Sequence, residues 1–126
     1  MRTANPMTLE TLRDFCLSKP GCTESFPFDE TTLVFKVGGK MFALLDIESR
    51  PVQVALKCDP ERALALREHY VAVQPGFHLN KTHWNTVTID GTVRWQDLTD
   101  WIDHSYQLVL KSLPRRVRIE IERVLV

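Results

Sequence analysis

The sequence contains no apolar run that approaches the roughly 18 residues of a membrane-spanning helix, and its longest run lies within Met41–Leu45. The first six residues hold one Arg with no apolar segment behind it, so no secretory signal is predicted. Cysteine is scarce: Cys16, Cys22 and Cys58 are odd in number, and their spacing fits no common zinc pattern. We therefore expect three reduced thiols in a cytoplasmic protein that has no membrane partner.

An imbalance of charge is also absent. The 126 residues hold 16 Lys and Arg against 16 Asp and Glu, which gives a formal net charge of zero. This balance argues against binding of nucleic acid or of an anionic membrane through bulk charge, so any such contact needs a local patch. The length suits one domain, taken here as 1–126, and 44% apolar with 25% charged residues is typical of a globular protein.

The first half of the chain is predicted to form one helix and four strands. Apolar residues at helical spacing place the helix over 8–18. Gly38-Gly39 separates the β-prone runs 32–37 and 40–45. Two glycines at this position predict a two-residue hairpin and not a phosphate-binding loop. The other predicted strands cover Glu24–Phe28, at an edge of the sheet, and 52–57.

The second half is predicted to be mainly helical. Asp59-Pro60-Glu61 has the order of N-cap, proline and acid that opens a helix, which we expect to end near residue 70. After a short strand over 86–89, Asp97 is the predicted N-cap of a third helix. The buried stripe of that helix is predicted to be Leu98, Trp101, Ile102, Ser105, Leu108, Val109 and Leu113. In the tail 115–126 the apolar residues alternate as in a strand, but they also fit one face of a helix. The helix is the favoured interpretation.

These elements predict an α+β fold in a single domain. We expect a two-layer sandwich in which helices pack on one face of an antiparallel sheet of about five strands. The segment 75–85 does not fit a purely structural role, because it packs histidine, asparagine, lysine and aromatic side chains into a loop that leads into a strand. Loops held by a rigid scaffold often carry functional residues.

The segment 75–85 reads Pro-Gly-Phe-His-Leu-Asn-Lys-Thr-His-Trp-Asn. It resembles the signature of the MmcQ/YjbR family, which is proline, glycine, an aromatic residue, histidine, any residue, asparagine, lysine, any residue, histidine and tryptophan. Phe26-Pro27-Phe28, 33–44, 57–60 and Ser105-Tyr106 also match in order, so the resemblance covers about residues 8–115. One departure is Asp29, where many members carry a glycine.

This resemblance implies a fold and a function. Members of the family have a two-layer α/β fold similar to that of type III secretion chaperones. They are often described as DNA-binding proteins that use a double-wing arrangement. The hairpin at Gly38-Gly39 is the natural candidate for a wing in this chain.

Nucleic-acid contacts are expected in the loop, at the hairpin and in the tail. From Lys111 onward, five basic side chains stand against two acidic ones, which is either an electrostatic footprint or the solvated face of a helix. Phe77 or Trp84 could stack on a base, although core packing is the favoured interpretation for Trp84. The candidate nucleic-acid-binding residues are Lys36, Lys40, His78, Asn80, Lys81, His83, Trp84, Arg115 and Arg116.

No metal, cofactor or catalytic site is predicted. His78 and His83 lie five residues apart without another ligand at suitable spacing, so we expect them to form hydrogen bonds that hold the loop. Cys58 precedes a helix, whose N-terminus lowers the pKa of a thiol, but nothing in the sequence connects it to either histidine. We therefore expect a protein that is not an enzyme.

Two functions are consistent with these features. The leading hypothesis is a small protein that binds DNA weakly, with single strands as one possible form, through phosphate contacts from Lys81 and Arg116. The alternative is a module that binds a peptide, a protein or a small anion, with the loop 75–85 as the wall of its pocket. The sequence also leaves open whether this loop is a binding site or a structural latch.

Overall fold

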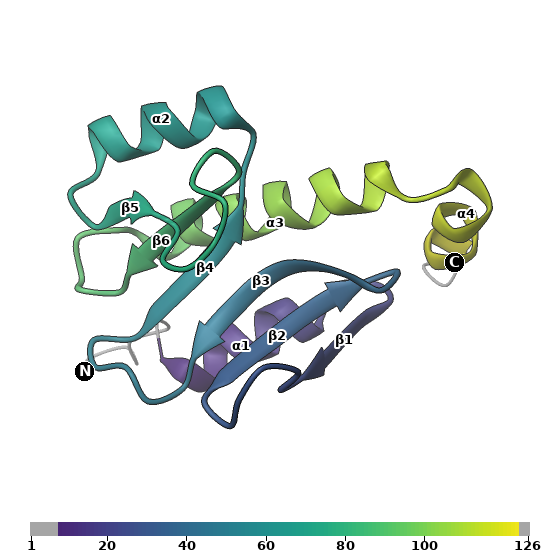
Figure 1. Cartoon of the computed structure of the whole chain (residues 1–126), viewed down its shortest axis with the longest axis horizontal. Coiled ribbons are helices and arrows are strands. Elements are labelled where there is room, and N and C mark those ends of the chain that lie inside the picture. Colours follow the sequence, from purple (N-terminus) through teal and green to yellow (C-terminus); the bar gives the residue numbers. More distant parts are fainter. Residues whose placement is uncertain (1–7, 124–126) are drawn as a thin grey trace, which may run out of the picture.

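The structure, a computed structural model, describes residues 8–123, in which it has four helices and six strands (Figure 1). The helices are α1 (Leu9–Leu17), α2 (Pro60–His69), α3 (Trp95–Ser112) and α4 (Arg115–Arg123). The strands are β1 (Cys22–Ser25), β2 (Thr32–Val37), β3 (Lys40–Asp46), β4 (Gln53–Lys57), β5 (Val73–Pro75) and β6 (Trp84–Thr88). Within residues 8–123 no helix has the length and apolar character needed to cross a membrane.

The strands form one antiparallel sheet in the order β1-β2-β3-β4-β6-β5. Gly38 and Gly39 have φ values of 58° and 82°, the left-handed conformation that a type I′ turn requires. The predicted hairpin between β2 and β3 is therefore confirmed. The sheet has six strands where about five were expected, because the three residues of β5 are too few to show alternation in the sequence.

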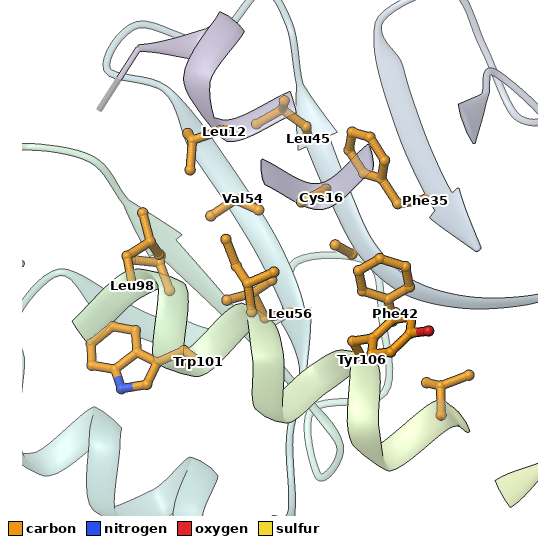
Figure 2. Packing of buried hydrophobic residues seen from close by; sticks show 14 of the residues in the cluster. Leu12, Cys16, Phe35, Phe42, Leu45, Val54, Leu56, Leu98, Trp101 and Tyr106 are labelled. Atoms are coloured by element: carbon orange, nitrogen blue, oxygen red, sulfur yellow. The ribbon is translucent and has the colours of Figure 1, made fainter. Parts of the chain in front are cut away.

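The helices pack on one face of the sheet, and the main hydrophobic core lies between the two layers. Figure 2 shows Leu12 and Cys16 of α1 and Trp101 of α3 against the inward side chains of the strands. Leu66 of α2 and Ile121 of α4 pack at the margin of the same core. The expected two-layer α+β sandwich is confirmed.

Three strand boundaries differ from the prediction. β1 covers Cys22–Ser25 rather than Glu24–Phe28, and both Phe26 and Phe28 are exposed beyond its end. Pro27 has no N–H for a ladder, which favours an end of the strand at this point. β4 starts at Gln53, one residue after the predicted start. β6 covers Trp84–Thr88 and so starts two residues before the predicted Thr86, because Trp84 pairs with Lys57 of β4. Such long-range pairing does not show in local alternation.

The third helix starts earlier than expected. α3 begins at Trp95, and the prediction that Asp97 caps it is wrong, because Asp97 lies in the first turn. Its carboxylate instead accepts from the Arg94 guanidinium, with an Nε to Oδ2 distance of 3.1 Å. The predicted stripe is otherwise buried except for Leu108, which is half-buried. By contrast, Asp59 caps α2 as predicted, since its carboxylate accepts from the Arg62 N–H.

The tail forms the favoured helix over Arg115–Arg123, and residues 124–126 of the predicted segment lie outside the described residues. The end of α3 and the helix α4 pack closely against two glycines of the first half of the chain. A Cβ atom at Gly38 would lie 2.5 Å from Cδ1 of Leu113, and one at Gly21 would lie 3.0 Å from Cγ2 of Ile121. The end of α3 therefore touches the β2–β3 hairpin, and α4 lies beyond it at the same end of the molecule (Figure 1).

Asp29 replaces the glycine of many family members and stabilises the turn before β2. Its Oδ1 atom accepts from the backbone N–H groups of Thr31 at 3.0 Å and Thr32 at 2.7 Å. These hydrogen bonds lower the pKa of the Asp29 carboxyl, so it is ionised at neutral pH. An Asx turn at Asp29 thus holds the chain where it enters β2.

Candidate functional site

The loop between β5 and β6, residues 76–83, is closed by its own polar groups. The Gly76 N–H donates to the Trp84 carbonyl at 2.8 Å, and the Lys81 ammonium donates to the Gly76 carbonyl at 3.1 Å. Asn80 forms a turn, since its Oδ1 accepts from the Thr82 N–H at 2.8 Å and its carbonyl accepts from the His83 N–H. Lys81 and Asn80, both predicted to contact nucleic acid, thus make hydrogen bonds inside the loop.

Arg67 of α2 fastens this loop to the helix layer. Its Nε donates to Oδ1 of Asn85 at 2.7 Å, and its Nη2 donates to the carbonyls of Lys81 and Trp84. Asn85 is only 2% exposed, and its Nδ2 donates to the Ala63 carbonyl of α2 at 3.3 Å. We call this set, Arg67, Asn85, Lys81 and the carbonyls they bind, the latch.

The sequence reasoning missed the role of Arg67 and did not place Asn85 in a site. One signal for a role of Asn85 was available in the sequence. Alternation places Asn85 and Val87 on the same, buried face of β6, where a polar side chain is unusual. A buried amide needs partners for both its donors and its acceptor. The partner residue on α2 could not be identified, because the helix approaches β6 only in the folded chain.

Trp84 packs in a small second core on the other face of the sheet. It is 5% exposed and lies with Val34 and Leu44, with Ala55 and Leu79 around them. Its ring therefore offers no surface for stacking on a base, and the packing interpretation is confirmed. A Cβ atom at Gly76 would lie 2.7 Å from Cβ of Trp84, so this glycine allows the loop to lie against the tryptophan.

A cavity of about 290 Å³ lies between the loop and this second face of the sheet. Its wall consists of three consecutive loop residues, Phe77, His78 and Leu79. Its floor is formed by side chains from four neighbouring strands: Thr32, Leu44, Asp46, Gln53, Ala55 and Thr86. Phe77 and His78 are both exposed, so the cavity opens to solvent at this wall.

The wall contains a strained residue. His78 has a φ of 60°, the one non-glycine residue in the described chain with a positive value. A side chain in this conformation is uncommon outside functional sites and turns, and the surrounding structure must hold it there. The latch provides that support on one side of His78, and the hydrogen bond from the Phe77 N–H to Oγ1 of Thr86, 3.3 Å long, provides it on the other.

Other hollows in the described chain are less suited to a ligand. The hollow beside Cys58 and Ser105 has a volume of about 10 Å³, which is room for one water molecule. A hollow of about 230 Å³ touches Arg67 and Lys81, each of which already donates hydrogen bonds within the latch. A third, of about 400 Å³ beside Leu9 and Phe26, has as its charged groups Arg13 and Glu24, which pair with each other.

The remaining candidate residues lie near the hairpin. Lys36 is half-buried on β2, while Lys40, Arg115 and Arg116 are exposed. The contact of Leu113 with Gly38 brings the last three toward one end of the molecule. We call Lys36, Lys40, Arg115 and Arg116 the basic end. Within residues 8–123, no hydrogen bond joins it to the candidate residues of the loop, so the nine predicted residues form two groups.

The prediction that the side chains of His78 and His83 form hydrogen bonds that hold the loop is wrong, since within residues 8–123 only backbone groups of His83 make such bonds. Residues 8–123 contain no group of three His, Cys, Asp or Glu side chains that could hold a metal ion. The pKa of the Cys58 thiol is raised, because burial outweighs the opposing effects of Arg62 and Arg67. Burial therefore opposes the lowering of this pKa that a helix N-terminus favours.

The fold and the latch define a class of protein: a two-layer α+β domain whose loop, fastened to a helix, walls a cavity on the second face of the sheet. The chain belongs to the YjbR family, since the family model described as YjbR matches residues 17–108. The resemblance read from the segment 75–85 is confirmed.

Similar proteins agree with this assignment. "Uncharacterized protein YjbR" of Escherichia coli (strain K12) is 38% identical over 113 residues, which are 89% of this chain and 95% of that protein. "Uncharacterized protein YbdF" of Escherichia coli O157:H7 is 36% identical over 108 residues, 85% of this chain and 88% of its own. The crystal structure of Deinococcus radiodurans protein DR2400 matches with a TM-score of 0.88 and 45% identity, over 95% of this chain and 92% of that one. The crystal structure of a protein from Pseudomonas syringae matches with a TM-score of 0.71 and 26% identity, over 82% of this chain and 99% of that one.

Proposed function

We propose that this protein is a cytoplasmic binding protein without catalytic activity, and that its ligand occupies the cavity walled by Phe77, His78 and Leu79. The observation that carries the proposal is the cavity itself, which lies between the loop of the family signature and an otherwise open sheet face. Ligand sites are typically concave, largely apolar and provided with a few polar groups that orient the ligand. Leu44 and Ala55 supply the apolar floor of this one.

The latch supports the proposal because it fixes the wall before any ligand arrives. Lys81 and Arg67 hold the loop at both ends, and His78 keeps a conformation that would relax in a free loop. A wall that is already ordered loses little conformational entropy when a ligand binds. In this proposal the signature loop is both a structural latch and one side of a binding site.

The absence of catalysis is part of the proposal. It is supported by the raised pKa values of Cys58 and of Cys16, the latter about 12, because a buried neutral thiol is a poor nucleophile. In the described chain the side chains of His78 and His83 form no hydrogen bond with a nucleophile. The proposed cytoplasmic location is supported by the free state of all three cysteines.

A thermal-shift screen with a library of small fragments tests the proposed site. A fragment at ten times its Kd stabilises the folded state by about 1.4 kcal/mol, which raises Tm by about 3 to 6 °C for a domain of this size. We expect fragments that stabilise the native chain to lose their effect on Ala55→Phe, because the larger side chain fills the cavity. Thr23→Phe is the matched control, since Thr23 is exposed on β1, outside the cavity lining. Equal shifts in all three proteins would contradict the proposed site.

Weak DNA binding is a second candidate function, and a specific observation favours it. The contact between Gly38 and Leu113 gathers Lys40 of the hairpin with Arg115 and Arg116 of α4. Clustered cations on a neutral protein are a local patch of the kind that phosphate contacts need. The loop gives this function less support, since the Lys81 ammonium is bound to the Gly76 carbonyl and Trp84 is buried.

Fluorescence anisotropy with labelled single- and double-stranded DNA tests this second function. We expect affinity to fall log-linearly with salt and to decrease several-fold in the double variant Arg115→Ala/Arg116→Ala. Lys81→Ala and Arg50→Ala are controls, because Lys81 serves the latch and Arg50 donates to the carbonyls of Ile47 and Ser49. An absence of binding at low salt, or an equal loss in the controls, would rule out the basic end as a DNA-binding surface.

A further inference from the structure

We propose that the cavity selects a small aromatic amine, with its ring against Phe77 and Leu79 and its positive charge beside Asp46. This inference rests on the proposed function and adds the chemical class of the ligand. It follows from three properties of the cavity: where its apolar surface lies, which polar atoms are left unbonded, and the sign of the nearby charge.

The apolar surface occupies one side of the cavity. Leu44 and Ala55 form the floor, and Phe77 and Leu79 rise beside them from the loop. Phe77 is 44% exposed although it is held in an ordered loop. An exposed aromatic side chain next to a cavity is a favourable partner for the face or edge of another ring. A flat ring therefore fits this side better than a flexible polar chain.

The next pair of residues on the same face of β3 and β4 presents hydrogen-bond acceptors. Asp46 and Gln53 are directly paired across β3 and β4, so their side chains lie together on the second face of the sheet. Oδ1 of Asp46 accepts from the N–H groups of Glu48 and Ser49, at 3.0 and 3.1 Å. Within residues 8–123, no hydrogen bond reaches Oδ2 of Asp46 or Oε1 of Gln53. These acceptors call for a donor on the ligand.

The local charge is negative. The lining residues of the described chain include no Lys or Arg, and Asp46 is their one carboxylate. Asp29, also ionised at neutral pH, binds Thr32 at the rim. The nearby cation Arg50 points its guanidinium at the carbonyls of Ile47 and Ser49. A small anion, one ligand considered from the sequence, would meet a carboxylate here with no Lys or Arg among the lining residues to compensate it, whereas an ammonium group would form a charge-assisted hydrogen bond with Asp46.

The volume limits the size of the ligand. About 290 Å³ is at the lower end of the range for small-molecule sites, roughly 300 to 1,000 Å³. A fused bicyclic ring with a short side arm fits such a space, while a peptide of several residues does not. Asp46 lies two residues along β3 from Leu44, so the arm must be long enough to place the ammonium group beside Asp46 when the ring lies on the apolar residues.

Isothermal titration calorimetry with three matched probes tests this selection. Tryptamine, 3-ethylindole and indole-3-propionate share one ring and one two-carbon arm, and differ in a positive, neutral or negative end. We expect tryptamine to bind the native chain at least tenfold more tightly than indole-3-propionate. In Asp46→Asn, which keeps the Oδ1 acceptor for Glu48 and Ser49, the preference should shrink to threefold or less.

The outcomes separate this inference from the proposed function. If all three probes bind equally, or if the preference for tryptamine persists in Asp46→Asn, the amine class is wrong. Binding that is nevertheless lost in Ala55→Phe would leave the proposed site standing. If no probe binds the native chain, the amine class is also wrong, and the fragment screen then decides whether the cavity binds anything else.

Discussion

The substitution Asn85→Ala tests whether the latch holds the loop. Asn85 is buried and makes two side-chain hydrogen bonds, one from the Arg67 guanidinium at 2.7 Å and one to the Ala63 carbonyl at 3.3 Å. A hydrogen bond with a charged partner contributes about 1.5 to 3 kcal/mol and a neutral one about 1 kcal/mol. Because the variant also leaves the Arg67 Nε–H without this acceptor, we expect the free energy of unfolding to fall by about 2 to 4 kcal/mol.

Urea denaturation followed by tryptophan fluorescence measures this loss. With an m-value of about 2 kcal/mol/M for a small domain, the unfolding midpoint should fall by about 1 to 2 M. His83→Ala is the control in the same loop, because the His83 side chain is exposed, and we expect a change within about 0.5 kcal/mol. A loss of less than 0.5 kcal/mol in Asn85→Ala, or an equal loss in both variants, would refute the reasoning.

Two further predictions concern the glycine of the signature and a histidine of α3. Gly76→Ala should reduce stability by about 1 to 3 kcal/mol in the same urea assay, because the new Cβ would lie 2.7 Å from Cβ of Trp84; an unchanged midpoint would show that the loop adapts. His104 accepts from the Asp59 N–H through Nε2 at 3.2 Å, and burial, the largest cause, lowers its pKa below the usual 6.5. A lowered histidine pKa means that the unfolded chain binds the proton more readily, so this contribution to stability is complete above about pH 6.5 and declines as the pH falls below that value. His104→Gln keeps an acceptor but does not titrate, and its urea midpoint should therefore vary less between pH 7.5 and pH 5 than that of the native chain.

Local signals in the sequence were enough for most of the fold. Helical spacing located α1, paired glycines located the β2–β3 hairpin, and Asp59-Pro60 located the start of α2. These features depend on residues within a few positions of one another. The prediction failed where distant residues decide the outcome, as at β6, which begins at Trp84 because of its pairing with Lys57.

The candidate site shows the same limit. The sequence identified the segment 75–85 as unusual and proposed it as a pocket wall, and the structure has Phe77, His78 and Leu79 in that position. The floor of the cavity could not be predicted, because Asp46 and Gln53 are brought together only by the register of β3 and β4. The hydrogen bond of Lys81 could not be predicted for a related reason: the partner of a lysine in a loop is known only when the carbonyl that it binds is located.

The central claim is that the loop of the family signature walls a ligand site. The most direct test is a titration of the isotopically labelled native chain with tryptamine, followed in ¹H–¹⁵N correlation spectra. We expect saturable shifts confined to amides of the lining, such as Ala55, Phe77, Leu79 and Thr86, and no such shifts in Ala55→Phe. Shifts that cluster instead at α4 and the hairpin, or an unchanged response in Ala55→Phe, would contradict the central claim.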